Sequence, residues 1–343
     1  MLLAEMGADV IKVEEPGAGD YMRWYPPLVE GQSAGFNSLN GNKRSITLNL
    51  KTDAGKRLFK ALAARADVVV EGNRPGVMDR LGLGWQVLHE LNPRLVMCSI
   101  TGYGQDGPFA QRAGHDLNYM ATAGALILNG PPGGAPHPLA VQVADIGAGG
   151  VGAAAAILGA LVGVLRGGQG RWLDVSMTDG ATSWMARDFA EAAAGGEERK
   201  PGHTRLTGAY PCYRVYTCAD GRFLSVAALE PKFWRELCEA LGRPDLLPLH
   251  MDTSRSAHAA LETVFAERSR AEWEALLEGR DVCVEPVLEV AEVAAHPQVA
   301  HRRLLEREWR LPPPGLGEHN AAVLGEVGVD ATELERLKAA GAV

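Results

Sequence analysis

Apolar stretches of strand length alternate with amphipathic stretches of helix length along the first hundred residues. Ala8–Glu14 and Ser45–Leu50 have the pattern of strands, and Thr52 or Asp53 is placed to cap the helix that follows. The continuous apolar run 67–72 is typical of a strand buried on both faces. Strands joined through helices pair in parallel, so the alternation predicts an α/β fold in which helices cover both faces of a parallel sheet.

The same alternation continues to about residue 194. A helix is expected over 85–92, strands over 94–101 and 171–177, and a helix over 178–194, before a polar stretch at 195–203. We therefore predict a large α/β domain over 1–187 and a linker over 188–205.

Beyond the linker the pattern changes to that of a smaller α+β domain, predicted over 206–300. Two alternating strands around the turn 219–221 predict a hairpin, and helices are expected to follow it. The remainder, 301–343, is expected to contain a Pro/Gly-rich linker and a final helix that returns to the large domain.

Charge and cysteine content restrict the partners and the compartment. The 343 residues include 34 Lys and Arg against 42 Asp and Glu, which gives a net charge of −8. The sequence has no run of basic residues of the kind that contacts the phosphate backbone of a nucleic acid. Nucleic acid is therefore not expected as a partner. The five cysteines are scattered and never form a Cys-x-x-Cys pair, which indicates reduced thiols and a cytoplasmic protein.

The segment Ile146–Leu165 is uncharged and could be mistaken for a membrane span. Glycine and alanine dominate it, so its transfer into lipid is weakly favourable, and we expect a buried helix of a soluble protein without a membrane partner. No secretory signal opens the chain. The first residues read as the second half of a helix leading into a strand, so we expect a further strand and turn upstream of Met1.

Two familiar motifs are considered and rejected. Gly102–Gly107 has the spacing Gly-x-Gly-x-x-Gly, but Pro108 follows it where a dinucleotide site needs a helix, so we expect a tight turn near a ligand instead. Histidines and acids, such as His296 and His301, lack the spacing of a set of metal ligands, so no metal site is predicted.

Three polar residues beside Gly-rich or turn segments are candidates for chemistry. Asp145 precedes the uncharged segment, where it could cap a helix or serve as a partly desolvated carboxylate, with amides near Gly147 stabilising an oxyanion. His115 stands at a helix start and Glu230 at the passage from hairpin to helix. Taken alone, each also fits an ordinary structural role, His115 as a satisfied histidine and Glu230 as a solvated acid.

An ordered series of motifs is similar to family III coenzyme A transferases, which include α-methylacyl-CoA racemases as well as true transferases. The resemblance runs along the whole chain. It rests on the stretches 1–23, 40–56, 72–85, 92–110, 167–180 and 296–305.

The stretch "GHDLNY", residues 114–119, resembles the racemase branch, because transferases usually lack a histidine at the position of His115. The resemblance implies a racemase of 2-methyl-branched acyl-CoA in which His115 and Asp145 exchange protons with the two faces of the α-carbon and Glu230 orients His115. A transferase with Asp145 as covalent nucleophile remains the alternative. A third reading is a non-catalytic protein that binds CoA thioesters.

The resemblance also implies where the acyl-CoA lies and how chains assemble. Arg23, Lys51, Asn73 and Arg80 match positions that contact CoA on the large, Rossmann-like domain, although each basic residue could also be a surface charge. The CoA thioester is the substrate, and no further cofactor is expected. The family fold implies an interlocked homodimer whose active site lies between the large domain of one chain and the small domain of the other.

Overall fold

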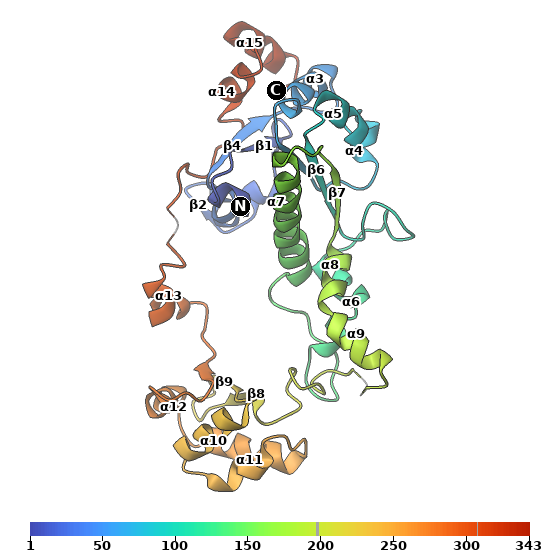
Figure 1. Cartoon of the computed structure of the whole chain (residues 1–343). Coiled ribbons are helices and arrows are strands. Elements are labelled where there is room, and N and C mark those ends of the chain that lie inside the picture. Colours follow the sequence, from blue (N-terminus) through green and yellow to red (C-terminus); the bar gives the residue numbers. More distant parts are fainter. Residues whose placement is uncertain (197–198, 307) are drawn as a thin grey trace. The chain divides into compact units, whose positions relative to one another are not determined.

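A computed structural model describes residues 1–196, 199–306 and 308–343 (Figure 1). The chain divides into two compact units. Unit 1 comprises Met1–Met120, Val141–Ser183 and Glu308–Val343, and unit 2 comprises Ala121–Ala140 and Trp184–Arg307. The predicted linker 188–205 includes positions 197 and 198, and the predicted segment 301–343 includes position 307, all three outside the described residues.

The boundary of the predicted large domain needs correction. Residues 121–140 and 184–187, which the sequence assigned to that domain, belong to unit 2. The segment 121–140 begins with the last two residues of helix α6 (Asp116–Thr122), contains the short 3-10 helix Leu126–Leu128, and is otherwise turns and irregular chain. A segment without regular periodicity carries no signal of the unit it packs with, so the pattern could not show this excursion.

Unit 1 contains the predicted parallel strands. Strand β1 (Val10–Glu14) pairs in parallel with β4 (Lys43–Thr47). Strand β6 (Val96–Thr101) lies between β5 (Val68–Glu71) and β7 (Trp172–Ser176), and both pairings are parallel. The α/β prediction is therefore confirmed, with one difference: the described strands form two separate parallel ladders and not one continuous sheet.

Helices and minor elements complete unit 1. Thr52 caps α3 (Asp53–Ala63): its hydroxyl oxygen accepts a hydrogen bond from the amide of Gly55 at 3.1 Å. Thr52 is one of the two residues expected from the sequence to cap this helix. The elements are α1 (Leu2–Glu5), η1 (Tyr21–Trp24), β2 (Leu28–Val29), β3 (Gln32–Ser33), α2 (Ala34–Asn40), α3 (Asp53–Ala63), α4 (Val77–Arg80), α5 (Trp85–Leu91), α6 (Asp116–Thr122), η3 (Val143–Val151), α7 (Gly152–Leu165), α8 (Met177–Trp184), α14 (Asn320–Gly325) and α15 (Ala331–Ala339).

The C-terminal helices supply part of the core of unit 1. Ile46 and Leu48, at and just beyond the end of β4, pack with Leu58 of α3 in a buried cluster. Val323 and Leu324 of α14 belong to the same cluster and are fully buried. Each such side chain stabilises the fold by roughly 1.5–3 kcal/mol relative to an exposed one. The last thirty residues are therefore an integral part of unit 1 (Figure 1).

Helix α7 is buried on one face only, whereas the sequence predicted a buried helix. Ile157 packs with Cys98 of β6, but Leu158, Val162 and Leu165 are 41%, 50% and 78% exposed. The span Val143–Leu165 is long and apolar enough to cross a membrane by length and composition, which a single core helix also satisfies. Glycine and alanine give no amphipathic pattern from which the exposed face could be read.

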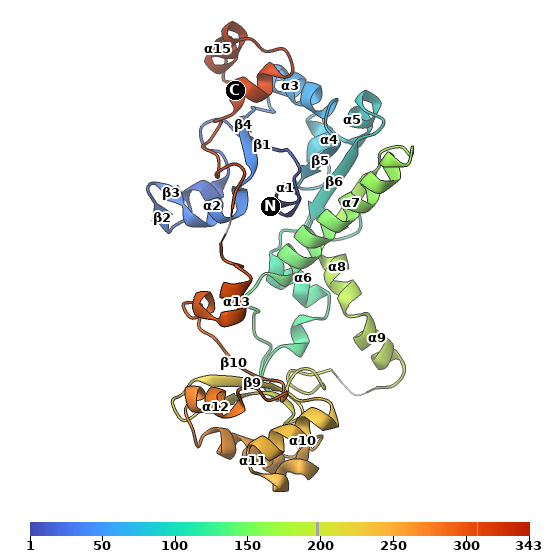
Figure 2. The same ribbon diagram turned by 60° about the vertical axis from the view of Figure 1, so that its left-hand side comes forward.

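Unit 2 contains the predicted hairpin of β8 (Tyr213–Thr217) and β9 (Phe223–Ala227), which pair antiparallel. A third strand, β10 (Val284–Pro286), adds to β9 and was not foreseen. Figure 2 shows the helices that gather around this sheet. The other elements of unit 2 are η2 (Leu126–Leu128), α9 (Ala186–Ala193), α10 (Pro231–Ala240), η4 (Pro244–Leu249), α11 (Arg255–Phe265), α12 (Arg270–Leu277), η5 (Val293–Ala295) and α13 (Pro297–His301).

The helix predicted over 178–194 is interrupted. Helix α8 ends at Trp184 and α9 begins at Ala186, with Met185 as the N-cap between them. The predicted linker therefore starts inside α9. All five cysteines are free thiols, and four of them are buried.

Candidate active site

The turn after β6 and the start of α6 form one wall of the site. Gly102 directly follows β6, and a Cβ at this position would lie 2.3 Å from the ring of Tyr119. The hydroxyl of Tyr119 donates to the carbonyl of Gly114 at 2.6 Å. Gly104 and Gly107 have φ values of +88° and +82°, which glycine adopts readily. The Gly-x-Gly-x-x-Gly spacing thus serves a tight turn and the close approach of an aromatic ring.

His115 is held by its backbone and leaves its ring free. Its amide donates to Oδ1 of Asn118 at 3.1 Å, and its carbonyl accepts from the amide of Asn118 at 2.8 Å. The side chain is exposed, and within the described part of the chain the imidazole has no hydrogen-bond partner. Both ring nitrogens are therefore available to a substrate.

Asp145 lies inside the helix start and does not cap it, which corrects one of its two sequence interpretations. The π-helical segment η3 begins at Val143, its N-cap is Gln142, and Gln142 provides no side-chain cap. Val143 and Ala144, the two residues before Asp145, already belong to this helical segment. Single π-helical segments inside α-helices occur frequently at functional sites.

The amides at this helix start are bound by a residue from α6. Oδ1 of Asp116 accepts from the amide of Ala144 at 2.7 Å and from that of Asp145 at 3.1 Å. Asp116 therefore caps η3 from 28 residues upstream. From the sequence, Asp116 and Asn118 were expected to shape this helix start and its hydrogen bonds without taking a proton, and for Asp116 the two bonds confirm it.

The charges around Asp145 alter its acidity. Burial raises the pKa of Asp145, the carboxylate of Asp116 raises this pKa further, and the charge of His115 acts in the opposite direction. Burial, and then the charge of Asp145, raise the pKa of Tyr119. His115, Asp116, Tyr119 and Asp145 therefore form one electrostatically coupled group within unit 1.

Gly147 and Glu230, two further predicted site residues, lie within η3 and at the start of α10. Gly147 is the fifth residue of η3, so its predicted role as an oxyanion donor stays a prediction. Glu230 is the exposed N-cap of α10, and its side chain makes no capping bond. It belongs to unit 2, whereas His115 and Asp145 belong to unit 1, and its action on His115 also stays a prediction.

Arg23, predicted to contact CoA, is engaged within the fold. Its Nε and Nη2 atoms donate to both carboxylate oxygens of buried Glu14 at 2.8 and 2.7 Å. Nη1 donates to the carbonyl of Pro314 at 2.9 Å, and the guanidinium lies 4.0 Å from the ring centre of Phe36. This arginine therefore joins β1 to the C-terminal segment.

The other predicted CoA residues lie on loops or helix ends of unit 1. Lys51 is exposed and pairs with Glu15 at 3.0 Å. Asn73 donates from its side chain to Glu71 at 3.1 Å. Arg80, the last residue of α4, is exposed and has no ion-pair or hydrogen-bond partner in the described part of the chain. Among the four predicted CoA residues, Arg80 is therefore the cation whose side chain is left unpaired for a phosphate.

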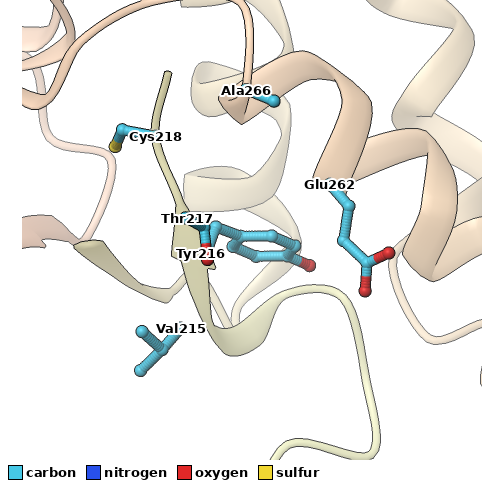
Figure 3. Close-up of a pocket in the computed structure, with 6 residues that line it drawn as sticks. All are labelled: Val215, Tyr216, Thr217, Cys218, Glu262 and Ala266. Atoms are coloured by element: carbon cyan, nitrogen blue, oxygen red, sulfur yellow. The ribbon is translucent and has the colours of Figure 1, made fainter. Parts of the chain in front are cut away.

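Two cavities lie apart from His115 and Asp145. One, of 320 Å³, runs along β8 in unit 2, where Tyr216 and Glu262 of α11 contribute to its lining (Figure 3). The other, of 120 Å³, lies in unit 1, where Glu71 of β5, Ser99 of β6, Trp85 and Trp172 are among the lining residues. The described residues include no group of three or more His, Cys, Asp or Glu that could hold a metal.

The sequence profile of "CoA-transferase family III" matches residues 1–321. The chain belongs to this family. It is therefore an enzyme of the CoA-transferase family III type, and the resemblance seen in the sequence is confirmed.

Relatives of this family III enzyme include both activities. It is 34% identical to alpha-methylacyl-CoA racemase of Mus musculus, over 98% of this chain and 91% of the relative. It is 32% identical to succinyl-CoA:glutarate CoA-transferase of the same species, over 100% of this chain and 86% of the relative. A crystal structure of a CAIB/BAIF family protein from Brucella suis matches with a TM-score of 0.81 at 31% identity, over 95% and 93% of the two chains. Overall similarity therefore does not separate racemase from transferase.

Proposed function

We propose that this enzyme is a racemase or epimerase that inverts the α-carbon of 2-methyl-branched acyl-CoA thioesters. The observation that carries the proposal is the coupling of an unpartnered imidazole, His115, to a half-buried carboxylate, Asp145, at two helix starts of unit 1. Inversion requires one group to remove the α-proton and another to deliver a proton to the opposite face. An imidazole and a carboxylate with a raised pKa are suited to work in both directions.

The proposed reaction is a 1,1-proton transfer. In one direction the carboxylate of Asp145 takes the α-proton, the C–H electron pair moves into the thioester, and an enolate forms. The imidazolium of His115 then donates its proton to the other face of the carbon. The reverse direction exchanges the roles. Amides of η3, with Gly147 as the predicted donor, would stabilise the negative charge on the thioester oxygen.

The CoA part of the substrate is proposed to bind unit 1 through Arg80, Asn73 and Lys51. The free guanidinium of Arg80 is suited to a phosphate, because its planar donors match phosphate oxygens. Arg23 would support this surface from within, since Glu14 already occupies most of its donors. No cofactor besides the CoA thioester is proposed, and the protein is proposed to work in the cytoplasm.

A homodimer is proposed in which Glu230 completes the site by orienting His115. The apolar residues Leu158, Val162 and Leu165 on the exposed face of α7 support assembly, because a second chain would remove them from water. Sedimentation equilibrium is expected to give twice the chain mass of 36.5 kDa. A monomer that retains full activity would contradict this arrangement.

The transferase alternative is supported by an identity of 32% to a CoA-transferase, similar to the 34% to a racemase. In that reaction Asp145 attacks the thioester carbonyl, CoA thiolate leaves, and an acyl-aspartyl anhydride forms. The deciding experiment incubates the enzyme with (R)- and (S)-2-methylacyl-CoA in deuterium oxide without an acceptor acid. A racemase is expected to incorporate deuterium and lose optical purity from either enantiomer. A transferase would do so with neither, would transfer CoA once an acid is added, and would give an adduct with hydroxylamine. A non-catalytic protein would only bind CoA.

His115→Ala tests the branch assignment directly. As a racemase the variant is expected to lose exchange by about 10²–10⁴-fold, because one face of the α-carbon then lacks its acid or base. The fold should survive, since the imidazole makes no hydrogen bond that holds the described structure together. Circular dichroism and deuterium exchange measured on the same preparation check both statements. Unchanged exchange would remove His115 from the mechanism.

A further inference from the structure

Asp116 stands next to His115 in the chain and next to Asp145 in space. Its Oδ1 atom accepts from two successive amides, those of Ala144 and Asp145, at 2.7 and 3.1 Å. The segments that it joins are 28 residues apart, and no other side chain caps this helix start in the described structure. The carboxylate therefore fixes the backbone from which the Asp145 side chain projects.

The backbone of His115, next to Asp116 in the chain, is also held by hydrogen bonds. Asn118 accepts from the amide of His115 and donates its own amide to the carbonyl of His115. The residue pair His115 and Asp116 thus has a defined backbone, and Asp145 is held to it by two hydrogen bonds to a charged acceptor. Hydrogen bonds of this kind are stronger than those between neutral groups.

We propose that Asp116 is a positioning residue that holds Asp145 at a fixed place beside His115 for proton transfer. The inference rests on the proposed function, because two acid/base groups on opposite faces of one carbon tolerate little change in their separation. A misplacement of about 1 Å at a reacting group lowers a rate by roughly 10²-fold.

A second consequence is electrostatic. In the described structure the ionisable groups that act on Asp145 are Asp116 and His115, and Asp145 in turn acts on Tyr119 of α6. After burial, the charge of Asp116 is the second cause that raises the pKa of Asp145. Asp116 therefore raises the pKa of Asp145 toward that of an imidazole. Two-way proton transfer requires the two groups to have such similar pKa values.

The test compares Asp116→Asn with Asp116→Ala. Asparagine retains an oxygen acceptor for the two amides but lacks the charge, whereas alanine lacks both. Asp116→Ala is expected to lower α-proton exchange by about 10²-fold. Asp116→Asn is expected to keep most of the exchange at neutral pH while the acid limb of its pH–rate profile moves to lower pH. The carboxyl ¹³C NMR titration of Asp145 should move in the same direction.

Asp330→Asn is the matched control, because Asp330 caps α15 of the same unit through the amide of Glu333 and has no role at Asp145. It should change neither rate nor profile. Full exchange in Asp116→Ala, or an Asp145 titration in Asp116→Asn that equals the wild type, would overturn the inference. Should alanine prevent folding, the asparagine variant alone decides. Absence of exchange in the wild type would instead overturn the proposed function, and the NMR titration would still report whether Asp116 acts on Asp145.

Discussion

Replacing Asp145 by alanine is expected to lower α-proton exchange from 2-methylacyl-CoA by about 10²–10⁴-fold. The carboxylate is one of two groups that must reach the α-carbon. In the described structure no other acid has a pKa that the charges of both Asp116 and His115 shift. Deuterium incorporation from each enantiomer measures the effect. Asp145→Asn, which preserves shape, should be similarly impaired, because an amide neither takes nor gives the proton.

The pH dependence of the wild type follows from the same carboxylate. Burial and the charge of Asp116 raise the pKa of Asp145, so the deprotonated base is lost at a higher pH than for an ordinary aspartate. Exchange that uses Asp145 as base should therefore fall as the pH decreases through this raised pKa. Asp179→Asn is a suitable control for the Asp145→Asn variant, since the side chain of Asp179 accepts a hydrogen bond from Ser176 at the start of α8. Undiminished exchange in Asp145→Asn would contradict the mechanism.

Replacing Arg23 by methionine is expected to lower the free energy of unfolding by about 3–5 kcal/mol. The change leaves Glu14, whose side chain is 2% exposed, as a buried carboxylate without its bidentate partner. It also removes the bond to Pro314 and the contact with Phe36. Urea unfolding at neutral pH gives the measurement.

Lys51→Met is the matched control, because Lys51 forms an exposed ion pair with Glu15 and should cost at most about 1 kcal/mol. Burial by itself would raise the pKa of Glu14, but hydrogen bonds from Arg23 and Ser45 outweigh it and lower the pKa. This contribution to stability is present above the pKa of Glu14 in the unfolded chain and is lost as the pH falls through the lowered folded value. Equal stability of both variants, with weaker CoA binding in Arg23→Met than in the wild type, would show that Arg23 serves the ligand and not the fold.

The residues of the proposed site could be singled out in the sequence because they lie beside strong local signals. The strands that became β4, β5, β6 and β7 were apolar runs bounded by turn residues, and His115 follows a Gly-rich turn after one of them. Asp145 was proposed because it is the acid in front of a long uncharged segment. Glu230 was proposed because a hairpin pattern changes there to a helical one.

Errors arose where distant segments decide the local structure. An N-cap was one of the two interpretations of Asp145, but Asp116 caps the helix from another segment, and the helix starts at Val143. The sequence also did not show that Glu14 and Pro314 occupy the donors of Arg23, whose contact with CoA stays a prediction. Neither partner lies at a spacing that a periodic pattern could reveal.

The α/β class, the parallel strands, the hairpin and the family could be predicted from the sequence alone, because backbone periodicity and turn chemistry are local properties and motif order belongs to the chain. The tertiary structure decided which acid holds Asp145, which face of α7 is exposed, and that 121–140 belongs to unit 2. These outcomes depend on packing and hydrogen bonds between residues far apart in the chain. Their energies arise only when the segments meet in space.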